Sequence, residues 1–409
     1  MPAWYPVTRL IVALMLMTLG GSAMYASVLV LEPAALEFGV GRGAASLPYA
    51  LYMLGFGVGG VVMGRVSDRT GILLPALAGS LFLPAGLLAA ADAQSIVTFC
   101  LAMSGLCGFL GAASTFAPLV SDISHWFHDR RGLAVGVVIS GNYLAGAVWP
   151  TILQHYFDLQ GWRETFQALA MLNLACMLPL ALCLYPRPVL DEVEHDTAGA
   201  PRYAARPLGL SRTQLQCLVC AAGVGCCIAM AMPQVHIVPY ALDKGFAAQR
   251  GAEMLALMLG FGVVSRVISG WLSDRIGGLR TLLLGSTLQA LVLVWFMFAD
   301  SLVMLYAAAV AFGLAQGGIV PSYAIIVRTF FPAGQAGWRI GVALLSTLCG
   351  MAVGSYMAGA LYDLTGSYTA SYVNAIAFNL LNMAIAAGLL RKAIRLMTPP
   401  PVIGVPQPA

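Results

Sequence analysis

The amino-acid sequence predicts an all-α membrane protein whose twelve transmembrane helices form two pseudo-symmetric six-helix bundles. Three observations carry this prediction: the composition, the spacing of the charged residues and an internal repeat. Of the 409 residues, 60% are hydrophobic and only 9% are charged, and the mean hydropathy is +0.84. Because soluble domains carry about 25% charged residues, this composition excludes a soluble fold.

The charged residues are spaced so that long apolar intervals recur between them. A membrane-spanning helix needs about 20 consecutive, mostly apolar residues. Six such intervals precede residue 187, at 10–31, 43–64, 70–91, 93–121, 132–154 and 165–186, and six follow residue 212, at 213–242, 254–273, 281–299, 301–327, 340–362 and 364–390. Each interval predicts one transmembrane helix, and only the eighth contains a charged residue, Arg266.

Polar segments divide the chain into domains. The stretch 187–212 is rich in charged residues and Pro, a composition that cannot bury a core. We therefore expect an N-terminal six-helix half at 1–186, a cytoplasmic linker at 187–212 and a C-terminal six-helix half at 213–395. The remaining segment, 396–409, contains five prolines and predicts a disordered tail.

An internal repeat relates the two halves. The segment GRVSDRTG at 64–71 matches GWLSDRIG at 270–277, and PAALEFG at 33–39 matches PYALDKG at 239–245, both at an offset of 206 residues. A third match, FDLQG at 157–161 with YDLTG at 362–366, has an offset of 205 residues. Repeats of this kind are common in membrane transporters, and these offsets place the two halves in parallel register.

The basic residues predict how the chain is oriented. With both termini inside, 16 of the 21 Lys and Arg residues fall in cytoplasmic segments and four fall outside. Because Lys and Arg accumulate in cytoplasmic loops, we expect a multi-pass protein of the bacterial inner membrane with both termini cytoplasmic. The net charge of +4 reflects this bias. It indicates no nucleic-acid partner, because the basic residues are scattered over short loops.

The remaining polar chemistry is sparse. The nine cysteines lie in apolar spans, where Cys serves as a small apolar residue. The histidines outside the spans lack metal-ligand spacing, and no Gly-rich phosphate loop precedes Lys-Ser or Lys-Thr. We therefore expect no metal, no cofactor, no ATP-driven transport and no enzyme activity, and no partner protein is implied.

These features resemble the major facilitator superfamily, whose loop between helices 2 and 3 carries the repeated Asp-Arg motif. Three segments are similar to the monocarboxylate porter and oxalate:formate antiporter group: WFHDRRGLAVG at 126–136, VHIVPY at 235–240 and Ser265-Arg266. The resemblance implies transport of small carboxylates such as lactate or pyruvate with a proton, or exchange of dicarboxylates for monocarboxylates. Helix 1 and helix 11 lack the Lys residues of these groups, and Gly262 stands where animal-type porters carry an Asp.

Several functions are compatible with this resemblance. Proton symport of a monocarboxylate by alternating access is favoured, because the proton neutralises the charge that would oppose the membrane potential. The alternative is a carboxylate exchanger of the oxalate:formate type. A carboxylate receptor that does not transport would be expected to carry a signalling domain, and an intramembrane enzyme would be expected to gather acids, bases or metal ligands at one depth.

Arg266 is the candidate substrate anchor. It lies eight residues before Asp274, hence about 12 Å along the helix in a hydrocarbon layer about 30 Å thick. Burying an unpaired guanidinium there costs at least ~2.5 kcal/mol, and its planar fork suits bidentate binding of a carboxylate. The alternative is an arginine that snorkels to the interface or pairs with another helix. Aligning the halves places Gly60 opposite Arg266.

Other polar residues are weaker candidates. Asn142, Gln316 and Tyr25 lie at midplane depth and are candidates to line the cavity, with hydrogen bonding between helices as the alternative. His236 is a candidate for substrate contact and for proton coupling, because histidine titrates near physiological pH, with a hydrogen bond to a neighbouring helix as the alternative. Glu32, at the outer end of helix 1, is a second proton-coupling candidate, unless it is only an exposed helix-end carboxylate.

The resemblance also implies a latch that closes the cytoplasmic face. Its residues are Gly64, Asp68, Arg69 and Gly71 in the first half, and Gly270, Asp274 and Arg275 in the second. Asp122 and Arg328, 206 residues apart, lie at the cytoplasmic ends of helices 4 and 10. The resemblance implies that Arg69 pairs with Asp122 and that Asp274 pairs with Arg328. For Asp122, proton coupling is the alternative role.

Overall fold

The computed structural model describes residues 4–123, 126–127, 131–185, 207–331 and 333–397. The described residues form helices joined by short loops, and no strand occurs among them. Within these ranges, twelve helical spans are long and apolar enough to cross a membrane. The predicted fold class and number of spans are thereby confirmed.

Six of these spans belong to the N-terminal half. This half contains α1 (Tyr5–Gly20), α2 (Ser22–Leu29), α3 (Leu31–Phe38), α4 (Arg42–Ala45), α5 (Leu47–Thr70), α6 (Leu73–Ala91), α7 (Ile96–Leu101), η1 (Ala102–Gly111), η2 (Ala112–Thr115), α8 (Ala117–Ile123), α9 (Arg131–Gln160) and α10 (Trp162–Leu182).

The other six spans belong to the C-terminal half. This half contains α11 (Arg212–Asp243), α12 (Ala248–Ile276), α13 (Gly278–Phe298), α14 (Leu302–Gln316), α15 (Ile319–Phe330), α16 (Ala333–Thr365) and α17 (Thr369–Met397), preceded by the short η3 (Pro207–Gly209). Most of the predicted linker and the predicted tail from residue 398 onward lie outside the described residues. Their predicted boundaries therefore stay predictions.

The fourth and tenth spans are interrupted at equivalent places. In the fourth span, a π-helical segment ends at Gly111 and a short 3-10 turn follows. In the tenth span, α14 ends at Gln316 and α15 begins at Ile319. Gly111 and Gly317 are 206 residues apart, so the interruption is part of the repeated scaffold. Breaks of this kind free backbone groups and often lie at functional sites.

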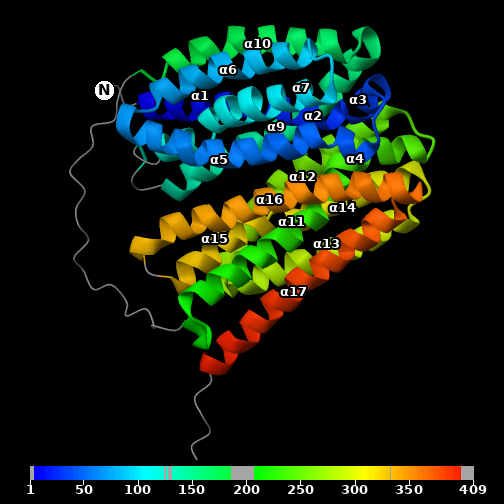
Figure 1. The fold of residues 1–409 in the computed structure, drawn as a ribbon. Helices are drawn as coiled ribbons and strands as arrows, with labels where there is room; N and C mark the ends of the chain where they lie inside the picture. Colours follow the sequence, from blue (N-terminus) through cyan, green and yellow to red (C-terminus); the bar gives the residue numbers. More distant parts are fainter. Residues whose placement is uncertain (1–3, 124–125, 128–130, 186–206, 332, 398–409) are drawn as a thin grey trace, which may run out of the picture.

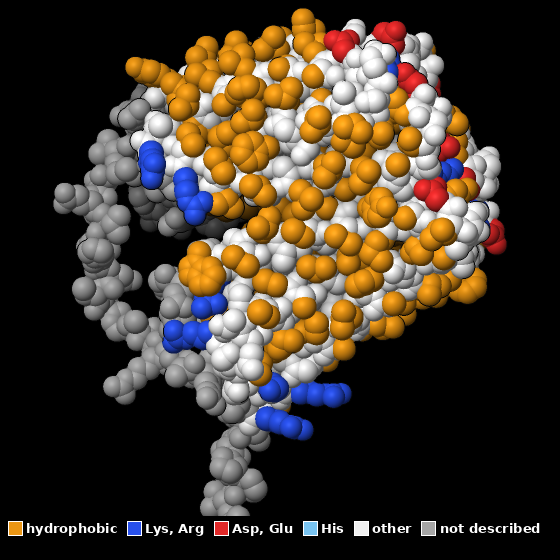
Figure 2. Space-filling view, in the orientation of Figure 1, with side chains coloured by type: hydrophobic (Ala, Val, Ile, Leu, Met, Phe, Trp, Pro, Cys, Tyr) orange, Lys and Arg blue, Asp and Glu red, His pale blue; other side chains and the backbone are white. Residues whose placement is uncertain are grey.

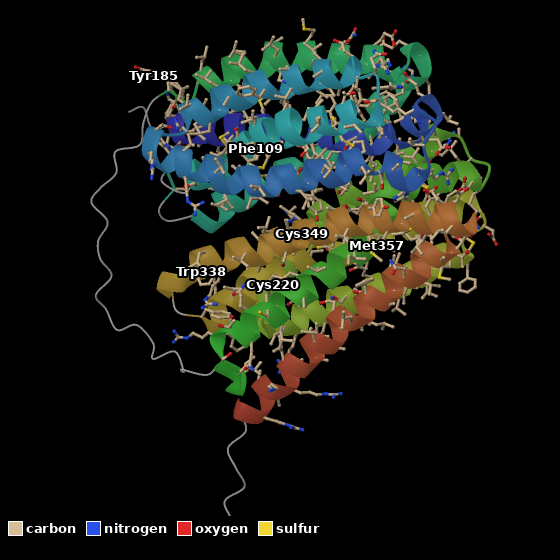
Figure 3. The ribbon with its side chains drawn as sticks, in the orientation of Figure 1. Phe109, Tyr185, Cys220, Trp338, Cys349 and Met357 are labelled. Atoms are coloured by element: carbon tan, nitrogen blue, oxygen red, sulfur yellow. The ribbon has the colours of Figure 1, made fainter. Side chains whose placement is uncertain are left out.

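The two halves lie side by side and meet along two helix pairs (Figure 1). Across this boundary α12 packs on α9, and α16 packs on α5 and α4. The described ends of the chain, near Trp4 and Met397, lie at the end of the bundle that we call the termini end. In Figure 3, Tyr185 and Trp338 mark this end of each half, and Cys349 and Met357 follow α16 along the boundary with the N-terminal half.

The surface differs between the two ends of the bundle. Figure 2 shows Lys and Arg side chains at the termini end and Asp and Glu side chains at the opposite end. The same view shows the surface hollowed between the halves at the termini end. At the opposite end the halves are in contact, because α4 of the N-terminal half packs on α16 of the C-terminal half.

Candidate functional site

Arg266 lies within α12, past its midpoint toward Ile276, at the boundary between the halves. Its guanidinium carbon is 4.0 Å from the centre of the Tyr143 ring, which belongs to α9 of the other half. Its Nε atom is buried and has no hydrogen-bond partner. No carboxylate among the described side chains lies within ion-pair distance of Arg266. The Arg266 guanidinium therefore rests on the face of the Tyr143 ring. Its Nε–H group remains a hydrogen-bond donor without an acceptor.

Gly262, one turn before Arg266, makes room for this arrangement. A Cβ atom at Gly262 would lie 2.6 Å from Cε1 of Tyr143. A larger residue would push the Tyr143 ring away from α12, and with it the surface on which the guanidinium rests. Where the animal-type pattern has an Asp, this chain has Gly262, and the space that the glycine leaves is filled by the Tyr143 ring of the other half.

The break in the tenth span lies against the same turn of α12. A Cβ atom at Gly317 would lie 2.9 Å from the backbone nitrogen of Arg266, so only glycine permits the close approach. Ser265 Oγ donates a hydrogen bond of 2.6 Å to the Leu314 carbonyl and ties α12 to α14. These contacts bring the end of α14 beside Arg266.

Gln316 ends α14 at this point and is fully buried. Its side-chain oxygen accepts a hydrogen bond of 2.5 Å from Nε2 of Gln234 on α11. Its own Nε2 is buried without a partner. Two unpartnered nitrogen groups, on Gln316 and Arg266, therefore lie around one helix break. Each of these two nitrogens is a hydrogen-bond donor whose hydrogen has no acceptor among the described atoms.

Tyr25 and Asn142 lie on the N-terminal side of the boundary. The Tyr25 hydroxyl donates to the backbone carbonyl of Asn142 at 3.2 Å, and the Tyr25 ring is buried against Gly146. The Asn142 side chain is half-buried and lines a small pocket with residues of α1, α2, α5 and the interrupted fourth span: Met17, Gly20, Gly21, Met24, Tyr52, Phe56, Ala112, Thr115 and Phe116. This wall is mostly apolar.

His236 is fully buried in α11 and both ring nitrogens are used. Nε2 lies 2.8 Å from the Ser355 carbonyl and Nδ1 lies 3.0 Å from the Tyr368 hydroxyl. Because a carbonyl can only accept, Nε2 carries the hydrogen and Nδ1 accepts from Tyr368. Burial raises the pKa of the Tyr368 hydroxyl, which keeps it protonated as a donor. His236 thus links α11 to α16.

Glu32 lies at the opposite end of the bundle in a charged cluster that joins the halves. Arg42 of α4 is 3.1 Å from Glu32 and forms two hydrogen bonds, of 2.6 and 2.8 Å, with Asp243 of the C-terminal half. Its guanidinium also covers the Tyr362 ring at 4.0 Å. Asp363 accepts hydrogen bonds from the backbone of Arg42 and Gly43, at 2.8 and 2.7 Å. Glu32 is therefore not a free helix-end carboxylate.

The latch pairing implied for Asp122 needs correction. Asp122 is paired with Arg9 of α1, through contacts of 2.7 and 2.8 Å, and not with Arg69. Arg9 is 1% exposed and lies 4.7 Å from the Trp126 ring. Arg69 is exposed in the last turn of α5. The buried arginine takes the buried carboxylate, because neither charge could remain unpaired there.

The second implied pair is also not formed in this conformation. Asp274 and Arg328 are both exposed, and no ion pair joins them in the described part of the chain. Arg275 instead covers the Trp271 ring at 3.9 Å.

The glycines of the two motifs divide into two kinds. Gly71 ends α5 and Gly277 ends α12, with φ of 82° and 83° that favour glycine. Gly64 and Gly270 have open space where a Cβ atom would lie. The Asp68 side chain lies outside the described atoms.

The sequence did not single out Tyr143, Gln234, Arg9 or Arg42. Tyr143 follows Asn142 and shares its predicted depth, and Gln234 is a polar residue in an otherwise apolar span. The positions of both residues along their spans could therefore have marked them as candidates. Arg9 and Arg42 were counted as loop cations, since each lies near a helix end. Their burial depends on which face of the helix they occupy, and apolar spans without alternating polarity do not show that face.

Comparisons with known proteins agree with this architecture. The sequence pattern of the Major Facilitator Superfamily matches residues 11–299 and 254–408. The chain is 28% identical over 336 residues to Monocarboxylate transporter 13 of Rattus norvegicus, covering 82% of this chain and 76% of that protein. It is 29% identical over 330 residues to Monocarboxylate transporter 11 of Homo sapiens, covering 76% and 67%.

Solved structures share the fold. A bacterial homolog of the human lysosomal transporter Spinster, in an inward-facing and unoccupied conformation, aligns with a TM-score of 0.75 over 98% of this chain and all of the other. The sequence identity is 14%, so this likeness concerns the fold alone.

Proposed function

Because the chain belongs to the major facilitator superfamily, we propose that it carries a small monocarboxylate, of the lactate or pyruvate type, across the membrane together with a proton. The observation that carries the proposal is the state of Arg266: a cation within a membrane span, resting on Tyr143, with a buried nitrogen that has no partner. The monocarboxylate transporters among its relatives support the substrate class.

A carboxylate fits the chemistry around Arg266. An unpaired guanidinium in the membrane costs at least ~2.5 kcal/mol, and a bound carboxylate offsets this cost with two charge-assisted hydrogen bonds. The unpartnered amide nitrogen of Gln316 lies around the same helix break and supplies a further donor for a carboxylate, carbonyl or hydroxyl oxygen. Asn142 and Tyr25 lie on the facing wall.

The number of cations favours a singly charged substrate. In the described spans Arg266 is the charged residue nearest the midplane, and its counterpart in the other half is Gly60. The wall around Asn142 is mostly apolar. A dicarboxylate would leave its second charge against apolar side chains, which is costly.

Alternating access assigns the two ends of the bundle to two gates. We place the termini end in the cytoplasm, because Lys and Arg gather there. The conformation then opens inward, with the outer gate closed by the Arg42 cluster across the two halves. The inner latch, with Gly64, Asp68, Arg69, Gly71, Gly270, Asp274, Arg275 and Arg328, would form when the termini end closes.

Proton coupling requires a group that gains and loses a proton during this cycle. Glu32 is our first candidate, because its side chain is 24% exposed and its partner Arg42 belongs to the outer gate. His236 is the second, since it hydrogen-bonds Tyr368 beside the same gate. Asp122 is the weakest candidate, because its buried pair with Arg9 gives it a structural role.

Carboxylate exchange is the second candidate function, and one observation favours it. The residue one turn before Arg266 is Gly262, packed on Tyr143, and no described carboxylate forms an ion pair with Arg266. In an exchanger the counter-substrate, and not a proton, would neutralise Arg266 in each half of the cycle.

Uptake of labelled lactate into proteoliposomes with an imposed inward proton gradient tests the proposal. We expect uptake by the wild type and a loss of about a hundredfold or more for Arg266→Ala, since at least one charge-assisted pair is removed. Arg65→Ala is the matched control, because Arg65 is exposed and its one hydrogen bond among the described atoms goes to the Val61 carbonyl of its own helix. Unchanged uptake in Arg266→Ala would remove the anchor assignment.

A second arm separates the two candidate functions. Proteoliposomes loaded with unlabelled lactate, and without a proton gradient, are compared with empty ones. Symport predicts that the imposed gradient drives net accumulation into empty vesicles. Accumulation that needs internal lactate and ignores the gradient would favour exchange.

A further inference from the structure

A groove lies at the termini end of the C-terminal half, away from Arg266. It is formed by the start of α13, the end of α15 and the last turns of α17, and its volume is about 190 Å³. Its lining is apolar except at Arg280 and Thr329, and Phe330, Leu390 and Ile394 contribute large apolar side chains.

Basic side chains surround the mouth of this groove. Arg280 lines the groove itself and is exposed. Arg391, Lys392 and Arg395 are exposed on the same turns of α17 that supply Leu390, Ala393 and Ile394 to the lining. None of these four cations forms an ion pair with a described carboxylate. Figure 2 shows Lys and Arg side chains gathered at this end of the C-terminal half.

The groove lies at the depth where lipid headgroups meet the protein. Arg280 is the third residue of the span Gly278–Phe298, and Arg395 is the last residue of the span Thr369–Arg395. The apolar lining therefore begins at the membrane boundary and the cations lie at its edge. A hydrocarbon chain matches the lining and a phosphate matches the cations.

The cation that lines this groove has no equivalent at the matching position of the other half. The residue that precedes Arg280 by 206 positions is Leu74, at the start of α6, and it is 52% exposed. The scaffold therefore does not require a cation at this position. A cation in one half alone points to a ligand of that half.

We propose that this groove binds one anionic phospholipid, with an acyl chain on the apolar lining and the phosphate on Arg280, flanked by the cations of α17. The lipid would pack on α15, which follows the helix break at Gly317. It would thereby contact the segment that connects the membrane surface to the substrate site. This inference does not depend on the identity of the transported substrate.

Binding of phosphatidylglycerol to the purified chain tests the inference. Native mass spectrometry measures the binding of phosphatidylglycerol and of phosphatidylcholine with the same acyl chains. The proteins compared are the wild type, Arg280→Gln and Arg65→Gln. Arg65 is the matched control, because it is exposed at the same end of the N-terminal half. We expect preferential binding of phosphatidylglycerol and an affinity about fivefold lower in Arg280→Gln alone, as expected for one Arg near anionic headgroups.

Three results would overturn the inference. Equal binding of the two lipids would exclude recognition of the anionic headgroup. An equal loss of affinity for phosphatidylglycerol in Arg280→Gln and Arg65→Gln would show that the lipid is attracted to basic surface charge in general and does not bind at this groove. Displacement of the bound lipid by glycerol phosphate at equal concentration would exclude a contribution of the acyl chain and the apolar lining.

Discussion

The two halves share one scaffold but differ in where their charges lie. Both carry the same loop motif, both interrupt their fourth helix at an equivalent glycine, and both end their second helix with a glycine of positive φ. The C-terminal half adds Arg266 and Gln316 at the centre, where the N-terminal half has Gly60 and Leu110. The repeat therefore accounts for the shared shape, and at these two positions the C-terminal half adds a cation and an amide.

The ends of the fourth helix in each half show the reverse difference. Asp122 is buried in a bidentate pair with Arg9, whereas Arg328, at the equivalent position, is exposed. In the N-terminal half, the charge of Asp122 is thus neutralised by a buried contact within the same half. The C-terminal half keeps Arg328 exposed, and Arg266 forms no ion pair with a described carboxylate, so we infer that this half contains groups that change partner during transport.

The largest effect that we expect is the loss of stability in Asp122→Ala. Removing the carboxylate leaves the buried Arg9 guanidinium without its counter-charge, which costs about 3–5 kcal/mol of the free energy of unfolding. Arg328→Ala, at the equivalent exposed position, should change it by less than about 0.5 kcal/mol. Unfolding of the purified variants in mixed micelles measures both. Equal effects would contradict the contrast between the halves.

The next effect concerns the break beside the substrate site. Gly317→Ala places a methyl group against the backbone of α12 at Arg266, and overpacking of this kind costs about 1–3 kcal/mol. We expect reduced stability and reduced lactate uptake. Gly388→Ala in α17 is the control, because nothing lies within contact distance of a Cβ atom at that position. If Gly317→Ala behaved like Gly388→Ala, the close packing of the break on α12 would not be required.

Arg42→Gln should weaken the closure at the opposite end. The substitution leaves the carboxylates of Glu32 and Asp243 without the cation between them. We expect a cost of about 1–2 kcal/mol, between those of exposed and buried pairs, and hence a shift of about 5- to 30-fold toward the form open at this end.

Distances between spin labels measure this shift. Leu36 and Leu364 are exposed at the opposite end, one in each half, and serve as labelling sites after the nine native cysteines are replaced. A longer label separation in Arg42→Gln than in the parent is the expected result. An unchanged distance distribution would show that the cluster does not hold the halves together.

The smallest effect should come from the aromatic face under the anchor. Tyr143→Leu removes the cation–π contact with Arg266, worth about 1 kcal/mol, so we expect the apparent KM for lactate to rise about fivefold. Tyr143→Phe keeps the ring and should keep the KM near the parent value. A KM that rose equally in both variants would assign the effect to the hydroxyl and not to the ring.

The sequence predicted the fold better than it predicted which side chains pair with one another. Apolar intervals between charges define the spans, and the distance from Arg266 to a charged helix end defines its depth. The facing of a residue was not predictable, because spans such as α11 are apolar on all sides. Arg9 and Asp122, 113 residues apart, form a pair that no local pattern indicates.

Equilibrium binding of lactate to the purified protein tests the central claim, that Arg266 of the C-terminal half holds the substrate carboxylate. The account predicts binding by the wild type and by Arg65→Gln with equal affinity. For Arg266→Gln it predicts an affinity about tenfold to a hundredfold lower, since hydrogen bonds to a charged group contribute about 1.5–3 kcal/mol. An unchanged affinity in a folded Arg266→Gln would contradict it.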